Sequence, residues 1–344
     1  MSDTEKKQPR RGLSLGWKIA LWVIAGLVTA ALLAAAVVSV LQFFDIVPAI
    51  SIPRHIIGYD DSVYTACGGT VSEKVTGLDI DWIAGDVRIV PTSDDELSIT
   101  ETWANGGEVK ETDALRRAVI ENRLYIKYTK PTQNLRMTQD KQLTVKVPAA
   151  WIEDFTQGIY VDTESGSVTV QINAKYLKIN TASADITVNG AYEKATFDTA
   201  SGMIRMTGSA ATLWADTASG DIVLDGKFGV TELDTASGQT RFTGSTDSME
   251  IDNTSGRVTL TLTAPADELD IETVSGPVTV FLPDALKGFV LDADTASADV
   301  NIHDFSVTYK KGKYTFGDGS MKFEFDSTSG DLDIFRTTVD AEGN

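Results

Sequence analysis

Apolar and polar positions alternate along the second half of the chain in a pattern that repeats. A Thr-x-Ser-Gly-like motif marks each repeat. The first five intervals between its serines are identical, and the next three are progressively longer. Five identical intervals with the same flanking pattern indicate a solenoid or a similar array. The motif serines are Ser165, Ser183, Ser201, Ser219, Ser237, Ser255, Ser275, Ser297 and Ser329.

The apolar columns around the motif predict the structure of one repeat. The position four before each serine is always apolar, and the positions three and five after it are apolar except at Thr240. This alternation is typical of β-strands with one buried face. We therefore expect an all-β fold, a single-stranded parallel β-solenoid with about 18 residues per coil and coils about 4.8 Å apart. A flattened, two-faced coil fits best. Handedness and the number of faces stay open, although the hexapeptide pattern of a three-sided helix is absent.

Hydroxyl residues form two further columns. A threonine stands two before seven of the nine motif serines and shares the parity of the apolar column, so both Thr and Ser are predicted to face inward and to form hydroxyl ladders along the stack. The glycine that follows suits a tight bend, because glycine tolerates positive φ. The predicted ladder residues are Thr199, Ser201, Thr217, Ser219, Thr235 and Ser237.

Breaks in the period divide the chain. The solenoid is predicted over residues 70–336, after a linker at 45–69, with inserts at about 97–147 and 303–325 and a frayed tail at 337–344. The first insert contains plausible strands at 97–100, 124–128 and 143–147 and a short helix around 113–120. The second contains a hairpin, 307–309 with 314–316, around Lys311 and Gly312.

The N-terminal segment predicts a membrane anchor. Ile19 and Phe44 bound a run of 26 uncharged residues, which as a helix would span about 39 Å, and residues 1–18 form a basic leader. The charge is +3 over residues 1–44 and −22 over the remainder. The positive-inside rule then places the leader in the cytoplasm and the body outside, as a single-pass protein of the cell membrane. Cleavage after residues 34–36 stays open, although a signal peptide has a shorter apolar core.

Several stretches resemble a known family. They are DWIAGDVRIVP, LTVKVP, the T-A-S-G-D-I series, LPDALKGFVLDADTASADV and FGDGSMKFEFDSTSGDLDIF. Together they are similar to the adhesin-like β-strand-repeat domain of unknown function in bacterial LiaG-type membrane-anchored envelope proteins. The resemblance covers about residues 70–336 and is weakest at 101–142. It implies an exported β-solenoid, and it implies no established activity or catalytic residue.

An acidic column three before the motif serine is predicted to face outward, and it includes Asp198, Asp216, Asp234 and Asp252. Carboxylates about 4.8 Å apart repel one another by about 1 kcal/mol even in water. Two interpretations stay open: each Asp caps backbone N–H groups near the bend, or the column forms weak Ca²⁺ or Mg²⁺ sites. Capping is favoured, because the glycine-rich nonapeptide of Ca²⁺-binding β-rolls is absent.

The remaining chemistry argues for binding. The two histidines, His55 and His303, have no metal-ligand spacing, and neither a nucleophile elbow nor a phosphate loop is present, so we expect no enzyme and no cofactor. A body at −22 disfavours nucleic acid. One cysteine, Cys67, excludes an internal disulfide. Two functions stay open: a structural or sensory envelope module that contacts membrane proteins or wall polymer, or an adhesin-like module for an external ligand. The sequence does not indicate the oligomeric state.

Overall fold

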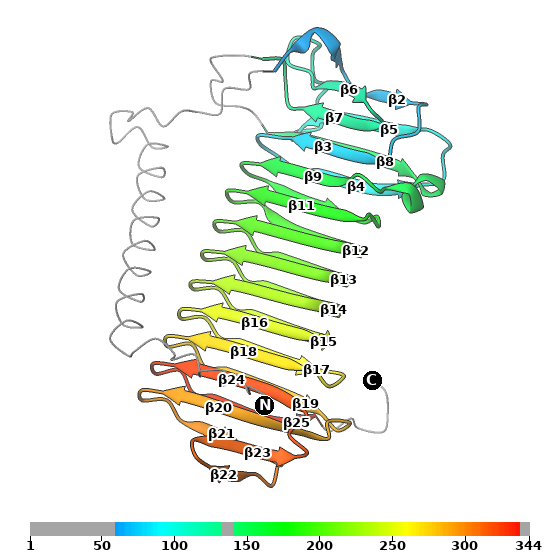
Figure 1. Cartoon of the computed structure of the whole chain (residues 1–344). Helices are drawn as coiled ribbons and strands as arrows, with labels where there is room; N and C mark the ends of the chain where they lie inside the picture. Colours follow the sequence, from blue (N-terminus) through cyan, green and yellow to red (C-terminus); the bar gives the residue numbers. More distant parts are fainter. Residues whose placement is uncertain (1–58, 132–139, 338–344) are drawn as a thin grey trace, which may run out of the picture. The chain divides into compact units, whose positions relative to one another are not determined.

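The computed structural model describes residues 59–131 and 140–337, and this part is a two-faced parallel β-solenoid (Figure 1). The predicted leader, the apolar run at 19–44 and residues 338–344 lie outside the described residues. Among the residues described, no helix is long and apolar enough to cross a membrane. The all-β expectation is confirmed.

The central coils follow the repeat that the motif serines mark. Ile186 pairs in parallel with Ile204, and Ile204 with Ile222, so each residue lies beside its equivalent in the next repeat. The strands that lead into the Thr-x-Ser-Gly turn form the first sheet, and the strands that leave it form the second. The central strands are β9 (Gly158–Thr163), β10 (Ser167–Val170), β11 (Tyr176–Thr181), β12 (Asp185–Thr199), β13 (Ile204–Thr217), β14 (Ile222–Thr235), β15 (Thr240–Ser245), β16 (Ser248–Asn253), β17 (Val258–Leu262), β18 (Glu268–Thr273) and β19 (Val278–Pro283).

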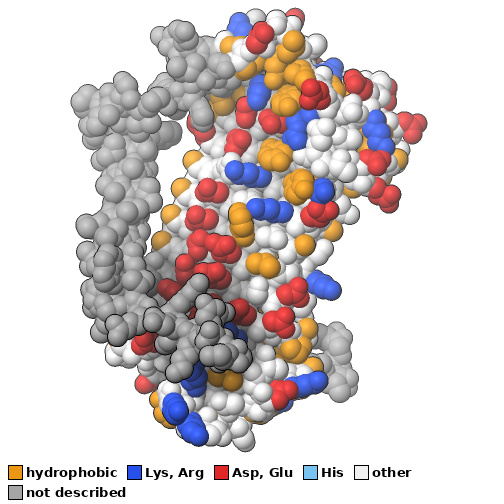
Figure 2. All heavy atoms as spheres, viewed as in Figure 1, with side chains coloured by type: hydrophobic (Ala, Val, Ile, Leu, Met, Phe, Trp, Pro, Cys, Tyr) orange, Lys and Arg blue, Asp and Glu red, His pale blue; other side chains and the backbone are white. Residues whose placement is uncertain are grey.

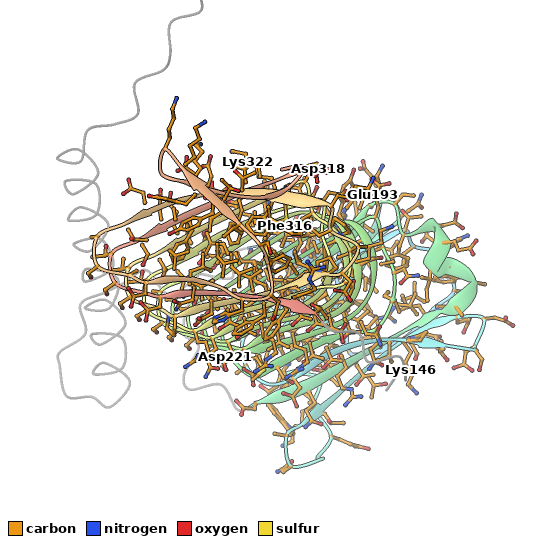
Figure 3. All side chains as sticks on the ribbon, turned by 90° about the horizontal axis from the view of Figure 1, so that it is seen from below. Lys146, Glu193, Asp221, Phe316, Asp318 and Lys322 are labelled. Atoms are coloured by element: carbon orange, nitrogen blue, oxygen red, sulfur yellow. The ribbon has the colours of Figure 1, made fainter. Side chains whose placement is uncertain are left out.

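Strands β12, β13 and β14 each run through the second bend and take part in both sheets. Their first halves lie in the second sheet and their last halves in the first. Between the sheets, the apolar columns meet: Ile204 and Ile222 from one side, and Phe197 and Leu233 from the other, are almost completely buried. Seen along the stack, the labelled Lys146 and Asp221 lie on one side of the flattened coil and Lys322 on the other (Figure 3).

The N-terminal end contains one more coil than predicted. Strands β7 (Arg123–Lys127) and β8 (Lys141–Pro148) pair in parallel with β3 (Gly77–Asp81) and β4 (Val87–Thr92), which pair in turn with β9 and β10. The predicted insert at 97–147 therefore supplies a complete coil. The antiparallel strands β5 (Leu97–Trp103) and β6 (Arg116–Ile120) pair with β8 and β7.

Two predictions for this end are wrong. Residues 116–120 form β6, not a helix, because Glu121 and Asn122 adopt positive φ and turn the chain into a tight hairpin with β7. The predicted linker also ends too late. It includes η1 (Asp61–Val63) and β1 (Thr65–Ala66), which pairs with β6, and it reaches the start of β2 (Gly69–Val71), which pairs with β5.

The C-terminal end fills a gap that the chain first leaves open. Strand β24 (Met321–Ser327) lies between β18 and β20 (Gly288–Thr295), and β25 (Leu332–Thr337) lies between β19 and β21 (Val300–Ile302). The last coil in the sequence is therefore the penultimate coil in space. A hairpin of β22 (Thr308–Lys310) and β23 (Lys313–Gly317) turns at Lys311 and Gly312, both with positive φ, and covers β20.

The motif glycines of the central coils are needed for a reason other than the one expected, although Gly166, in the first motif, does have positive φ. Gly202, Gly220 and Gly238 do not have positive φ. Instead, each lies directly on the preceding coil: a Cβ at Gly220 would lie 1.9 Å from the carbonyl oxygen of Gly202. Real Cβ atoms do not approach a backbone oxygen so closely. The close stacking of turns, and not turn conformation, therefore selects glycine here.

We expect Gly220→Ala to lower the free energy of unfolding by about 2–3 kcal/mol, because the added methyl group overpacks rigid backbone. The matched control is Ser219→Ala, one residue earlier, where the side chain is exposed and its hydroxyl makes one long hydrogen bond, 3.4 Å, to the carbonyl oxygen of Ala200. The control should change stability by about 0.5 kcal/mol or less. Urea unfolding of both variants measures the difference, and equal losses would contradict the stacking explanation.

Candidate functional site

The hydroxyl columns have two different roles. Thr199, Thr217 and Thr235 are buried, and each Oγ1 accepts a hydrogen bond from the backbone N–H of the motif glycine three residues on, at 3.0, 2.9 and 3.1 Å. The threonines therefore brace their own turn and do not bond to one another along the stack.

The prediction that the motif serines face inward is wrong. Ser201, Ser219 and Ser237 are exposed. Side-chain parity holds only within an extended strand, and the strand ends at the threonine, so the serine belongs to the turn. The hydroxyls of Ser219 and Ser237 donate to carbonyl oxygens of the preceding coil.

The acidic column runs along the outer face of the first sheet. Asp198, Asp216, Asp234 and Asp252 lie side by side on successive strands, in direct register. Figure 2 shows acidic side chains gathered along this edge of the face, with basic and apolar side chains beside them higher in the view.

The capping role predicted for this column is not observed. Within residues 59–131 and 140–337, no backbone N–H donates to these four carboxylates. Acids on the side of the second sheet cap backbone N–H groups instead. Asp185 accepts a hydrogen bond from the N–H of Met203 at 2.8 Å, and Asp221 accepts one from the N–H of Gln239 at 2.8 Å. No group of three or more His, Cys, Asp or Glu side chains in the described part is arranged to hold a metal ion.

The crowded column has perturbed acidity. Partial burial, together with the neighbouring carboxylates of Asp252 and Asp216, raises the pKa of Asp234 to about 7. Glu232 on the same strand and Glu250 on the next one contribute to the same shift. Burial also raises the pKa of Asp216 and of Asp252, in each case with help from one nearby carboxylate. The face therefore carries more negative charge than it readily accommodates.

This crowding predicts an unusual dependence of stability on pH. A carboxyl whose pKa is higher in the folded than in the unfolded state, where it is about 3.9, binds its proton more tightly when folded. Stability should therefore rise as the pH falls from about 8 to about 5. After discounting for solvent screening, we expect about 1 kcal/mol from Asp234. Asp234→Asn should be more stable than the parent at pH 8 and show a shallower slope. A parent melting temperature that falls between pH 8 and pH 5 would contradict the prediction.

The same face changes character toward the N-terminal coils. Two rings protrude from it: Tyr176 on β11, with 37% of its surface exposed, and Trp214 on β13, with 42% exposed. Lys175 Nζ lies 5.4 Å from the Tyr176 ring centroid, and Lys194 Nζ lies 3.4 Å from that of Trp214. Val230, 52% exposed, continues this apolar surface on β14.

A hollow of about 460 Å³ opens beside these rings, at the second bend of the coil. One wall is η2 (Ala149–Asp154) and the residues that follow it. The other wall is the bend of β12 and β13, where the small side chains of Ala191 and Ala211 leave the hollow unfilled. Glu193, at its rim, lies at the edge of the coil on the η2 side, away from the Thr-x-Ser-Gly turns (Figure 3).

A family of known proteins matches residues 75–335, more than half of the chain, and its description is Toastrack DUF4097. The chain belongs to the Toastrack DUF4097 family. This agrees with the adhesin-like domain of unknown function that the sequence resembles. No curated protein matches the chain.

Two solved structures are similar to this Toastrack chain. A “putative adhesin” from Bacteroides fragilis is 11% identical with a TM-score of 0.40, covering 81% of this chain and 100% of its own. A “putative cell adhesion protein” from Clostridium sporogenes is also 11% identical with a TM-score of 0.19, covering 80% of this chain and 98% of its own.

The Toastrack domain also contains a buried ion pair that the sequence analysis missed. Lys141 is fully buried, its Nζ lies 3.0 Å from Glu101 Oε2, and it donates to the carbonyl oxygens of Asp113 (2.9 Å) and Tyr128. Its Nζ also lies 4.1 Å from the Tyr128 ring centroid and 5.2 Å from that of Trp82. Glu101 accepts the backbone N–H of Leu115 at 2.8 Å. Lys141 thus joins three segments of the N-terminal cap, and burial lowers its pKa although Glu101 opposes this.

Proposed function

We propose that the chain is a single-pass, membrane-anchored Toastrack protein whose extracytoplasmic solenoid acts at the bacterial cell envelope by binding, and not by catalysis, in a structural or sensory role. The observation that carries the binding role is the outer face of the first sheet. It presents Tyr176, Trp214 and Val230 to solvent beside a hollow. Apolar side chains gathered on one face, rather than scattered singly, are typical of an interaction surface.

Anchoring is supported by the sequence. The uncharged run at 19–44 is long enough for a bilayer, and the basic leader precedes it. The partners of the solenoid would be envelope membrane proteins or cell-wall polymer.

Protease treatment of intact cells whose wall has been removed tests the orientation. We expect the solenoid to be accessible and the leader, tagged before residue 18, to be protected, because positive charge is retained on the cytoplasmic side. Detergent-permeabilised cells provide the control in which the tag is lost. Digestion of the tag in intact cells, with the solenoid protected, would contradict the topology.

Co-sedimentation with purified cell-wall material tests the binding role. The full chain, in a detergent without a sugar head group, should sediment with the wall fraction, while Trp214→Ala combined with Val230→Ala should sediment less. The matched control combines Ser219→Ala and Ser237→Ala, which alter exposed turn residues away from the rings. Equal recovery of both pairs would exclude this face from wall binding.

The alternative is an adhesin-like module for an external ligand. The same exposed rings favour it, because such a ligand would need an accessible apolar surface. Sedimentation with the cell's own wall material would favour the envelope role over this alternative, because an adhesin for an external ligand would remain in solution.

A further inference from the structure

We propose that the hollow beside η2 is a binding site for an uncharged oligosaccharide. The site would hold one or two sugar units in the hollow, with the chain continuing over the rings of Tyr176 and Trp214. This inference rests on the proposed binding role and gives it a location and a ligand class.

The hollow is an open depression whose volume is that of a small-molecule site. Its volume of about 460 Å³ falls within the range of about 300–1,000 Å³ that is usual for ligand pockets. Phe155 and Ile152 supply apolar wall, and Ala174, Ala191 and Ala211 supply small side chains. The backbone at its floor is fixed by pairing between coils, including the N–H of Ala174 to the carbonyl oxygen of Ala191 at 3.3 Å. The site is therefore preformed.

The rim offers both donors and acceptors. Lys175 and Glu193 pair at 3.5 Å, with side chains 39% and 64% exposed. Asn173 Oδ1 accepts a hydrogen bond from the backbone N–H of Ala191 at 2.9 Å. This bond fixes the orientation of the Asn173 side-chain amide, so its NH₂ group points away from that N–H. Glu153 and Thr156 complete the polar lining. Sugar hydroxyls both donate and accept, so a rim of mixed polarity suits them.

The charge of the rim argues against an anionic ligand. Lys175 is already opposed by Glu193, and Glu153 adds a further negative charge. At the rim itself a phosphate or carboxylate group would meet no unpaired cation, and the nearby Lys194 holds its ammonium group against the Trp214 ring. A neutral ligand is not repelled by the acidic side chains, and its hydroxyls can form hydrogen bonds with either Lys175 or Glu193 of the exposed ion pair.

The rings lie where a bound chain would leave the hollow. Tyr176 follows Lys175, a rim residue. Trp214 lies two strands further along the same outer face and two residues further along its strand, about 12 Å away at the usual spacings, with Lys194 between the two rings. Exposed rings with a polar neighbour offer a flat apolar surface and a hydrogen-bonding edge. The C–H faces of a pyranose chain match such a surface.

Titration calorimetry on the full chain, in a detergent without a sugar head group, tests the site. The probes are chitotetraose and maltotetraose, which are uncharged, and tetragalacturonate, which is anionic. We expect a neutral probe to bind and tetragalacturonate to bind at least tenfold more weakly. Ala191→Phe, which fills the hollow, and Tyr176→Ala, which removes one ring, should each weaken the neutral probe at least tenfold.

Ala218→Phe is the matched control, because it adds the same side chain at an exposed alanine of a turn outside the hollow and should leave affinity unchanged. Circular dichroism melts verify that all three variants fold. Absence of heat with both neutral probes overturns the ligand class, and a neutral probe that binds Ala191→Phe normally overturns the site. If wall co-sedimentation persists in either case, the binding role stands while this inference fails.

Discussion

Glu101→Gln is expected to lower the free energy of unfolding by about 3–5 kcal/mol, because it leaves the buried ammonium group of Lys141 without its counter-charge. Lys141 is fully buried and the Glu101 side chain is only 6% exposed, so water cannot replace the lost partner. The loss should shrink as the pH rises toward the ordinary lysine pKa of about 10.4, since a neutral amine no longer needs a counter-charge.

Two further variants isolate the pair. Glu101→Gln combined with Lys141→Met should recover much of the stability, because a buried ion pair can often be replaced by apolar side chains at little cost. Asp154→Asn removes the acid of an exposed pair with Lys74, whose side chains are 57% and 47% exposed, and should cost about 1 kcal/mol or less. Guanidinium unfolding at pH 7 and pH 10 measures all four proteins. Equal losses for Glu101→Gln and Asp154→Asn would mean that the cap does not depend on this pair.

The repeat pattern predicts the coils well because alternation reports burial directly. Every central strand that carries the apolar columns is found, and equivalent positions of successive repeats pair with each other as predicted. The same pattern cannot predict the order of coils at the ends. Residues 321–337 have the same columns as their neighbours, so nothing local indicates that β24 and β25 lie between two earlier coils.

The side-chain predictions fail where the strand geometry ends. The inward assignment of Ser201 extends strand parity into a turn, whereas Thr199, the last strand residue, is buried. Lys141 shows the opposite case. It shares parity with Leu143, Val145 and Val147, so this alternation was the signal that could have placed it inside and prompted a search for a buried acid partner. The hollow was unpredictable, because it depends on where η2 packs against the bend.

A pair of deletions tests most directly whether one repeat of the motif forms one structural unit. Removing residues 213–230 joins Thr212 to Thr231. Thr231 then takes the place of Leu213, because Leu213 and Thr231 pair on successive coils. The start of β13 and the end of β14 then merge into one strand of normal length, and every apolar column stays in register. Each coil contacts mainly its neighbours, so a shorter, folded and slightly less stable protein is expected.

Removing only residues 213–221 joins Thr212 to Ile222 and places a second-sheet strand where the first sheet continues. Ile222 then takes the place of Leu213. However, the strand reaches Gly226 where Thr217 begins the turn, so the turn is lost and the buried columns beyond it lose their register with the neighbouring coil. Circular dichroism and thermal melting of the two deletions in the full chain decide the matter. A cooperative melt for the full-repeat deletion and loss of the folded signal for the half-repeat deletion is the expected result, and identical behaviour of the two would contradict the one-repeat coil.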